Sequence, residues 1–194
     1  TTVTDAVWWF YLFWGAKFLF SQFGVDIKNV GLPFLVIFIM ADAGSLLGGL
    51  ASGALIRKGW SINKSRKITL LVNAIIILPV ALVPMIASKW LAIFIIGIGA
   101  FGHQSWSINS YTLVPDVFPK KATASVIGIG KMVGVAVSIV ADLALGSVLD
   151  KAGNSGYFWA FVIAGFSYLA ILGFVHLLMP KMTPLDDNLE YITK

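Results

Sequence analysis

Cysteine is absent from this 194-residue sequence, histidine occurs twice, and only 12% of the residues are charged. Without cysteine, disulfide frameworks and thiolate-ligated metal sites are excluded. The two histidines lack the spacing of metal ligands, and no convergent set of nucleophile, base and metal ligand can be found for a membrane-embedded enzyme. We therefore expect no enzymatic activity, no cofactor and no metal site.

The scarcity of charge also excludes an ordinary soluble domain, in which about 25% of residues are charged. Hydrophobic residues make up 58% of the chain, and they form six runs long enough to cross a bilayer, which takes about 20 residues of α-helix. Helices are expected because backbone polar groups in lipid must bond within their own segment. The expected fold is an all-α integral membrane bundle. The six predicted spans are 5–22, 31–56, 67–87, 90–114, 122–149 and 156–179, and a polar cytoplasmic tail follows over 181–194.

The basic residues predict the orientation of these spans. Segment 52–67, between the second and third spans, carries five of the fourteen Lys and Arg residues and no acid. Such a loop stays in the cytoplasm because Lys and Arg resist translocation. Nine basic residues then lie inside and three lie outside, at Lys28, Lys89 and Lys151. Both termini of a multi-pass cell (inner) membrane protein are thus predicted to be cytoplasmic, and the net charge of +5 reflects topology and not nucleic-acid binding.

Ionisable side chains inside spans are costly and usually face protein or water. In the first span, Tyr11 and Trp14 lie three residues apart on one face, and Lys17 continues that face by one turn. An aromatic face that ends in a cation suits a ring-shaped anion. Alternatively, the two aromatic rings pack against neighbouring helices while Lys17 extends its ammonium toward the interface.

The second span contains Asp42, followed by Gly44 and Gly48. Glycines four residues apart predict close contact with another helix. Asp42 is a candidate proton-coupling residue, because a carboxylate inside the membrane can take up a proton or pair with a cation. The alternative is a hydrogen bond from its side chain across a helix interface.

The fourth span has the densest polar run, and it contains His103, Gln104, Trp106 and Asn109. A single histidine in a span is ordinarily a hydrogen-bonded interior group. Several polar side chains in the middle of one span favour a solvated cavity instead, in which they hydrogen-bond a ligand.

The fifth span carries Lys131 among three glycines, which allow a ligand or another backbone to approach the ammonium closely. A ligand carboxylate is one natural partner, and a structural ion pair is the alternative. Asp142 returns to almost the same face of the helix, but it lies about 16 Å further along the axis. The two residues therefore cannot pair within one helix.

Six motifs, taken with Lys17 and the six-span layout, resemble the C-terminal half of a major facilitator superfamily transporter over nearly the whole chain. More narrowly, they resemble the anion:cation symporter family and, within it, bacterial hexuronate transporters. The motifs are DAVWWFYLFW at 5–14, ADAGS at 41–45, LIRKGWS at 55–61, HQSWS at 103–107, PDVFPKK at 115–121 and SVIGIG at 125–130.

The resemblance implies a twelve-span symporter that works by alternating access, with this chain supplying spans seven to twelve. The implied partners are a small organic anion, protons, membrane lipids, and the N-terminal six-helix half of the same transporter or a second copy of this chain. The anion is expected to be a sugar acid such as glucuronate or galacturonate. The implied substrate-binding residues are Tyr11, Trp14, Lys17, His103, Gln104, Trp106, Asn109 and Lys131.

Three alternatives to hexuronate symport remain open at this point: transport of another organic anion such as galactonate, a homodimerising half-transporter, and a channel or structural bundle. The chain opens with Thr1 and not Met, so we expect it to start within a longer gene product or after processing. It also departs from the family pattern twice. Ser52-Gly53-Ala54 lacks the acid of a Ser-Asp-Arg motif, so the ion pair that latches the inward gate is expected to be missing, and Lys131 stands where a small residue is usual.

Overall fold

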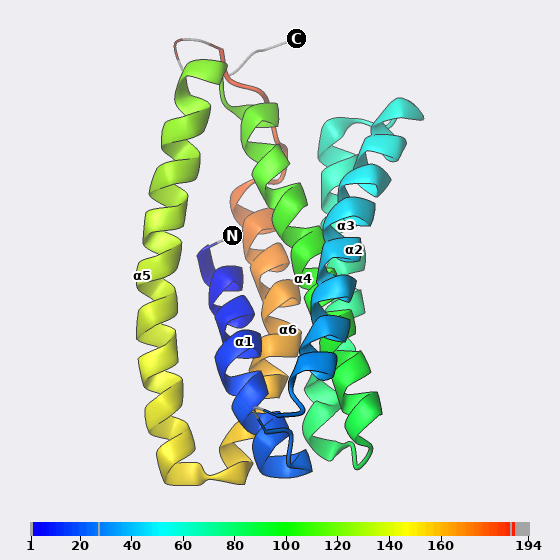
Figure 1. The fold of residues 1–194 in the computed structure, drawn as a ribbon. Helices are drawn as coiled ribbons and strands as arrows, with labels where there is room; N and C mark the ends of the chain where they lie inside the picture. The colour runs from blue at the N-terminus through cyan, green and yellow to red at the C-terminus, as the bar shows by residue number, and fades with distance from the viewer. Residues whose placement is uncertain (1, 27, 187, 189–194) are drawn as a thin grey trace.

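The computed structural model describes residues 2–26, 28–186 and 188 of the chain. The described residues form a bundle of helices that run alternately up and down, which confirms the all-α prediction (Figure 1). The helices are α1 (Thr2–Phe23), α2 (Gly31–Arg57), α3 (Ile62–Ile77), the 3₁₀ helix η1 (Leu78–Met85), α4 (Lys89–Val117), α5 (Lys120–Ala152) and α6 (Asn154–Leu178).

Five segments of the described chain are long and apolar enough to cross a membrane. Helix α1 is not among them, because Asp5, Lys17 and its three tryptophans lower its hydropathy. The first predicted span, 5–22, therefore stays a prediction. The five segments are Gly31–Arg57, Ile62–Met85, Lys89–Val117, Lys120–Leu149 and Ser155–Leu178.

The third predicted span, 67–87, differs from the structure at its start and in its second half. It begins at Ile62, where the Ser61 hydroxyl caps the helix by accepting a hydrogen bond from the Lys64 amide. At Leu78 the α-helix gives way to η1. The cause is Pro79 and Pro84, because proline has no N–H to donate to the carbonyl four residues back.

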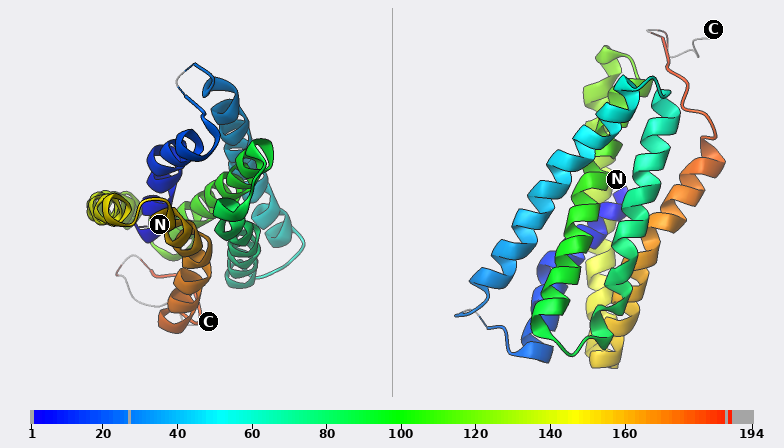
Figure 2. Two further views of the ribbon diagram at one scale, coloured as in Figure 1. Left: turned by 90° about the horizontal axis from the view of Figure 1, so that it is seen from below. Right: turned by 90° about the vertical axis from the view of Figure 1, so that its right-hand side faces the viewer.

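Helix α4 lies in the middle of the bundle, between α1, α2, α3 and α5 (Figure 2). Its contact with α2 is close because two glycines face it. A Cβ atom on Gly44 would collide with the backbone of Phe101, and one on Gly48 would collide with Ser105. The predicted small-residue face of the second span is therefore confirmed, and it fixes the distance between α2 and α4.

Helix α5 stands at the edge of the bundle, beside α1 (Figure 2). Most of its middle part is exposed and apolar, as at Met132, Val140 and Leu143. Helix α2 likewise exposes Leu46 and Leu50. Large apolar faces of this kind are suited to lipid or to another protein surface.

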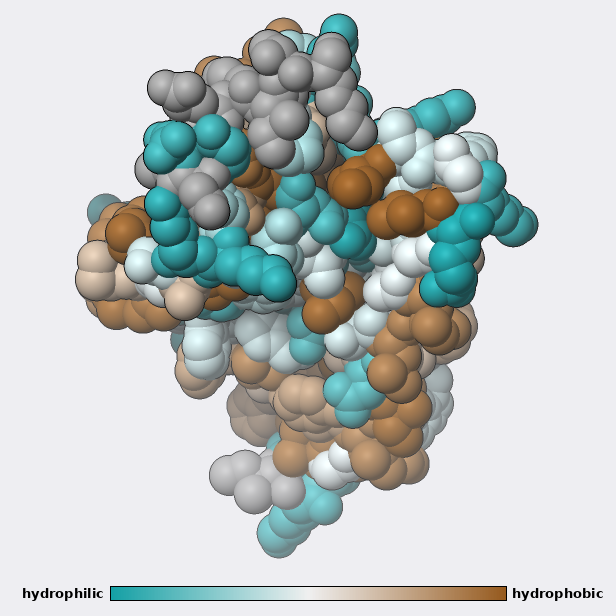
Figure 3. Space-filling model, turned by 90° about the horizontal axis from the view of Figure 1, so that it is seen from above, coloured by the Kyte–Doolittle hydropathy of each residue, from teal (hydrophilic) through white to brown (hydrophobic). Residues whose placement is uncertain are grey.

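We call the end of the bundle where α2 meets α3 and α4 meets α5 the basic end. It carries Lys58, Lys64, Lys120 and Lys121, and the described part of the tail lies across it (Figure 1). Seen from this end, hydrophilic side chains gather around the helix termini while the sides of the molecule are hydrophobic (Figure 3). This separation fits a bundle whose sides contact lipid.

Candidate functional site

An ion pair joins α1 to α5 across the contact between these two helices. The Lys131 ammonium lies 2.9 Å from Oδ2 of Asp5, and it also lies 4.8 Å from the centre of the Tyr111 ring on α4. Lys131 is eleven residues into α5, about 16 Å from its start, and so lies well within the candidate membrane span Lys120–Leu149. The Lys131 side chain is 46% exposed and that of Asp5 is 11% exposed, so the ammonium is the accessible partner.

An aromatic enclosure surrounds His103 at the centre of α4, fourteen residues from either end of that helix. Nδ1 of His103 hydrogen-bonds to the Tyr168 hydroxyl at 2.6 Å, and Trp8 stacks on the imidazole with ring centroids 5.1 Å apart. Trp106 meets Tyr168 edge to face at 5.2 Å. Two residues predicted to lie together, His103 and Trp106, are thus brought together through Tyr168.

The ion pair and the aromatic enclosure are neighbours, because Asp5 and Trp8 lie three residues apart on one face of α1. They form a continuous polar and aromatic region between α1, α4, α5 and α6, which we call the mid-membrane cluster. Its members are Asp5, Trp8, His103, Trp106, Tyr111, Lys131 and Tyr168.

A pocket of about 290 Å³ adjoins this cluster on the side of the basic end. It is lined by Trp106 and Tyr111 of α4 and by Gly130, the neighbour of Lys131. The indole nitrogen of Trp106 and the hydroxyl of Tyr111 are buried and have no hydrogen-bond partner among the described residues. Two unsatisfied polar groups beside a cavity are suited to binding a hydroxylated ligand or water.

The tail closes this pocket from the basic end. Met179 and Met182 line it, and the Lys67 ammonium donates hydrogen bonds to the carbonyls of Met179 at 2.8 Å and Pro180 at 2.7 Å. Further along, the Leu185 amide donates to the Val117 carbonyl of α4. Of the predicted tail over 181–194, positions 187 and 189–194 lie outside the described residues.

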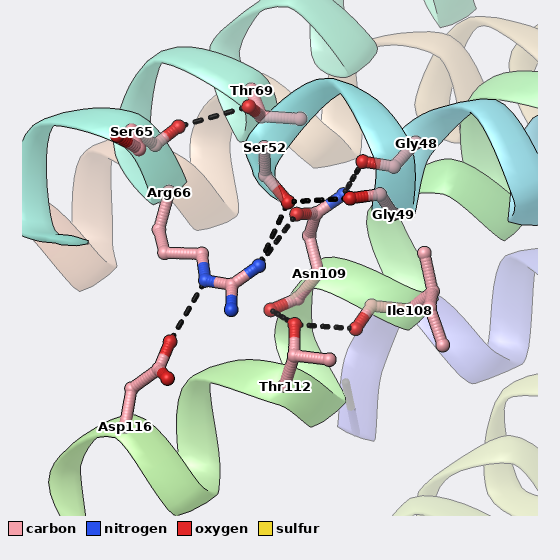
Figure 4. A network of polar contacts seen from close by, with 10 residues as sticks. All are labelled: Gly48, Gly49, Ser52, Ser65, Arg66, Thr69, Ile108, Asn109, Thr112 and Asp116. Carbon is pink, nitrogen blue, oxygen red and sulfur yellow. Dashed lines mark hydrogen bonds and ion pairs between the residues drawn. The ribbon is translucent and has the colours of Figure 1, made fainter. Parts of the chain in front are cut away.

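A second ion pair lies at the basic end, between Arg66 of α3 and Asp116 of α4, with a distance of 2.8 Å (Figure 4). The Arg66 guanidinium also donates to the Ser52 hydroxyl at 2.8 Å and to Oδ1 of Asn109 at 3.2 Å. This pair is not the one expected to be missing at Ser52-Gly53-Ala54, and that expectation stays a prediction. Although Ser52-Gly53-Ala54 contains no acid, Asp116 supplies the carboxylate from another helix.

Asn109 belongs to this basic-end network and not to the mid-membrane cluster. Its amide nitrogen donates to the Gly48 carbonyl at 3.0 Å, and its oxygen accepts from Arg66 (Figure 4). The same nitrogen also donates to the Ser105 carbonyl at 2.8 Å. The residue is completely buried. Its hydrogen-bonding atoms are thus used within the protein.

The aromatic face predicted on the first span is divided between two neighbours. The Tyr11 hydroxyl lies against Gly99 of α4, and it has no hydrogen-bond partner in the described chain. Trp14 lies against Gly146 of α5, with the Lys17 ammonium 5.0 Å from its ring centre. Lys17 is exposed and far from the ion pair, since it follows Asp5 by twelve residues, about 18 Å along the helix.

The remaining predicted residues stand apart from the cluster. Gln104 is half-buried on α4, and Asp42 is exposed on α2. Neither side chain has a hydrogen-bond or ion-pair partner within residues 2–26, 28–186 and 188. The same residues contain no group of three or more His, Cys, Asp and Glu side chains that could hold a metal ion.

Asp5 and Tyr168 are the functional candidates that the sequence did not single out. Asp5 sits at the predicted start of a span, where an acid is ordinarily solvated, and nothing in the local sequence links it to Lys131. Its signal was nonetheless present, because a lysine inside the fifth span requires a counter-charge and Asp5 is one of few acids within predicted spans.

Comparison with known proteins identifies the class of molecule, although no family model matches the chain. The hexuronate transporter of Escherichia coli (strain K12) is 27% identical over 172 residues, covering 88% of this chain and 39% of the relative. A probable galactarate/D-glucarate transporter of Bacillus subtilis (strain 168) is 26% identical over 193 residues, covering 97% and 41%. The chain is a homologue of sugar-acid transporters.

This homology confirms the predicted resemblance to sugar-acid transporters of the major facilitator superfamily. A third relative of this transporter homologue, a probable L-galactonate transporter of Escherichia coli (strain K12), is 26% identical and covers 73% of the chain and 32% of the relative. All three are named as transporters, in agreement with the prediction that the chain is not an enzyme. The chain spans about two fifths of the first two relatives' length.

Proposed function

We propose that this chain is the C-terminal half of a twelve-span secondary transporter that carries a sugar-acid anion together with protons by alternating access. The observation that carries the proposal is the position of Lys131. Its side chain lies within a candidate membrane span and is almost half exposed, and its ammonium has a single carboxylate partner among the described residues. A cation placed in this way is suited to binding an anionic ligand.

Lys131 binds the carboxylate of the substrate in this proposal. An ammonium deep in the bilayer is costly unless it is paired, and a charge-assisted hydrogen bond to a carboxylate offsets that cost. The glycines that precede Lys131 have open space around them, so a ligand can reach the ammonium. The Tyr111 ring beneath the ammonium holds it in place through a cation–π contact.

Lys17 has a different role, because Lys17 and Lys131 are too far apart to bind one small anion. Asp5 contacts Lys131, and Lys17 lies about 18 Å from Asp5 along α1. We assign exposed Lys17, with Trp14 beside it, to the mouth at the end opposite the basic end. There the cation attracts anions before they bind.

The hydroxyl groups of the sugar acid are bound by the unsatisfied polar atoms near Lys131. The Trp106 indole N–H and the Tyr111 hydroxyl line the adjoining pocket. The Gln104 amide is half-buried on the same helix, two residues before Trp106. His103 and Tyr11 support this surface from behind, because both are buried against neighbouring helices. Asn109 anchors α4 to α2 and Arg66, so we leave it out of the substrate site.

The basic end faces the cytoplasm in this proposal, since Lys and Arg resist translocation. The protein then lies in the inner membrane of the cell, and both termini of this segment face the cytoplasm. Lipid and the N-terminal half of the same transporter cover the apolar faces of α2 and α5. A second copy of this chain is the alternative partner, and the mass of the complex purified after expression of the full-length gene distinguishes the two.

The names of the relatives favour a second candidate within the same class. Two of the three act, by name, on galactarate/D-glucarate or L-galactonate and not on a hexuronate. An aldarate carries two carboxylates and an aldonate one on an open chain. The accessible ammonium at Lys131 suits one carboxylate. This favours a monoanion, such as an aldonate or a hexuronate, over an aldarate with its two carboxylates.

Uptake into proteoliposomes tests the proposal. The full-length protein that contains this chain is reconstituted, and a proton gradient is imposed. Labelled glucuronate is then supplied together with one unlabelled competitor: galacturonate, galactonate, galactarate, glucose or phosphate. Saturable, proton-driven uptake blocked by hexuronates alone supports the first candidate. Equal inhibition by galactonate or galactarate favours the second. Uptake that does not saturate indicates a channel, and inhibition by phosphate or glucose alone contradicts the sugar-acid class.

A further inference from the structure

We infer that Asp5 is the proton-coupling residue of this half, because its carboxylate and the carboxylate of the transported anion compete for the Lys131 ammonium. The inference rests on the proposed function and adds to it a residue and a balance of charge. It starts from the ion pair itself, in which Asp5 Oδ2 and Lys131 Nζ lie 2.9 Å apart between α1 and α5.

The two members of this pair differ in accessibility. Asp5 is largely buried at the contact of α1 with its neighbours, whereas almost half of the Lys131 side chain is exposed. A ligand carboxylate can therefore reach the ammonium from its open side without entering the helix interface. Asp5 is thus the internal counter-ion of Lys131. A ligand carboxylate can replace it at the ammonium only if Asp5 is displaced or protonated.

Protonation determines which carboxylate binds the ammonium. With Asp5 ionised, an arriving anion places a second carboxylate beside the same ammonium, and repulsion between like charges opposes binding. When Asp5 takes up one proton it becomes a neutral carboxylic acid, Lys131 keeps its own protons, and the ammonium pairs with the ligand. The site has zero net charge before and after this exchange. One proton and one monoanion thus enter together, and no unpaired charge is left inside the membrane.

The other ionisable groups around Asp5 do not fit this role. On α4, Tyr111 lies beneath Lys131, and His103 is held by Tyr168 of α6 and by the Trp8 ring. Tyr168 lies within electrostatic range of Asp5, but it is completely buried. These groups respond to the charge on the pair, whereas Asp5 directly controls the availability of the ammonium.

Asp42, the residue predicted from sequence for proton coupling, differs from Asp5 in the same respect. It is exposed on α2 and has no cationic partner among the described residues. Protonation of Asp42 therefore releases no bound ammonium. Because both residues are acids inside predicted spans, Asp42 is the matched control for Asp5.

The inference can be tested by measuring how labelled glucuronate binds to the full-length protein, purified and embedded in nanodiscs. We expect the affinity of the wild type to fall about tenfold per pH unit toward alkaline pH, because one proton is taken up per glucuronate. Titration calorimetry in buffers of different ionisation enthalpy counts that proton. The Asp5→Asn variant should bind with an affinity independent of pH, take up no proton, and exchange glucuronate across proteoliposomes without accumulating it.

The Asp42→Asn variant should keep the pH dependence and the proton count of the wild type. If Asp5→Asn does not insert, Asp5→Glu replaces it, and its pH profile should move to higher pH because glutamate is the weaker acid. An unchanged profile in either Asp5 variant, or a flat profile in Asp42→Asn, overturns the inference. Wild-type affinity that is independent of pH overturns the inference alone, whereas a wild type that binds no sugar acid at any pH overturns the proposed function with it.

Discussion

The Arg66–Asp116 and Lys131–Asp5 ion pairs are nearly equal in length, 2.8 Å at the basic end and 2.9 Å between α1 and α5, but their surroundings differ. Arg66 is 8% exposed, and its guanidinium contacts Asp116, Ser52 and Asn109 on two other helices. Lys131 is half exposed, and its ammonium has one carboxylate partner within the described part of the chain. At the basic end this contact distance belongs to a fixed structural ion pair. Between Lys131 and Asp5 it belongs to a contact in which the ammonium can exchange its partner.

The choice of side chain follows this difference. The planar guanidinium of Arg66 presents several N–H donors in a fixed arrangement, which suits three simultaneous acceptors. The ammonium of Lys131 is a compact charge on a flexible stem and can turn from one acceptor to another. Arginine at the basic end thus favours rigidity, and lysine inside the membrane favours exchange of partners.

Removing the arginine should have the largest effect. We expect Arg66→Met to lower the free energy of unfolding by about 3–5 kcal/mol, because Asp116 is left as an unpaired carboxylate in a partly buried site. Denaturant unfolding in detergent measures the change. Arg57→Met is the control, since Arg57 is exposed at the end of α2 and should matter little. Equal stability of Arg66→Met and wild type would show that this joint is not structural.

Removing the lysine should weaken substrate binding. A hydrogen bond between charged groups contributes about 1.5–3 kcal/mol, so Lys131→Ala should reduce glucuronate affinity roughly 10- to 100-fold and abolish uptake at low concentration. Lys151→Ala, in the last turn of the same helix, should leave uptake unchanged. Normal uptake by a correctly inserted Lys131→Ala protein would remove Lys131 from the site.

Glycine packing should hold the middle of α2 against α4 independently of the Arg66–Asp116 ion pair. Adding a methyl group at Gly44 forces α2 away from Phe101, and overpacking of this kind costs about 1–3 kcal/mol. Gly128→Ala is the matched control, because no atom lies near that position. Thermal unfolding of both variants measures the difference. A Gly44→Ala protein as stable as Gly128→Ala would assign the rigidity to the Arg66 network alone.

The smallest effect is expected at Lys17. An exposed cation that only attracts the ligand contributes roughly 0.2–1 kcal/mol, so Lys17→Gln should slow initial uptake no more than about fivefold. The effect should shrink at high ionic strength, where exposed charges are screened. Initial rates at two salt concentrations test this. A loss as large as that of Lys131→Ala would mean that Lys17 binds the substrate directly.

The helices and the basic end were predictable because both follow from local composition. Long apolar runs can satisfy their backbone only as helices, and Gly44 and Gly48 recur at the spacing of a close helix contact. Pro79 and Pro84 also indicate a break in the α-helix at η1. Averaging hydropathy over a window of residues does not reveal such a break. These features require no knowledge of how one helix is rotated against another.

The partners of the polar residues were not predictable from one sequence, since they depend on that rotation. Asp5 and Lys131 are 126 residues apart, and Arg66 and Asn109 are 43 apart. Helical periodicity states which residues share a face but not which neighbour the face meets. For this reason Asn109 was expected beside His103, although the structure turns it toward α2, and Asp5 was overlooked as the counter-charge of Lys131.

The tail contacts at the basic end link helices that the chain does not join directly there. Lys67 connects α3 to the residues after α6, Asn63 of α3 accepts a hydrogen bond from the Met182 amide, and Leu185 reaches the end of α4. The polypeptide thereby returns to two earlier helices and ties them to the last one. Shortening the chain after residue 180 would therefore loosen three helix ends together and open one wall of the pocket, instead of trimming a passive extension.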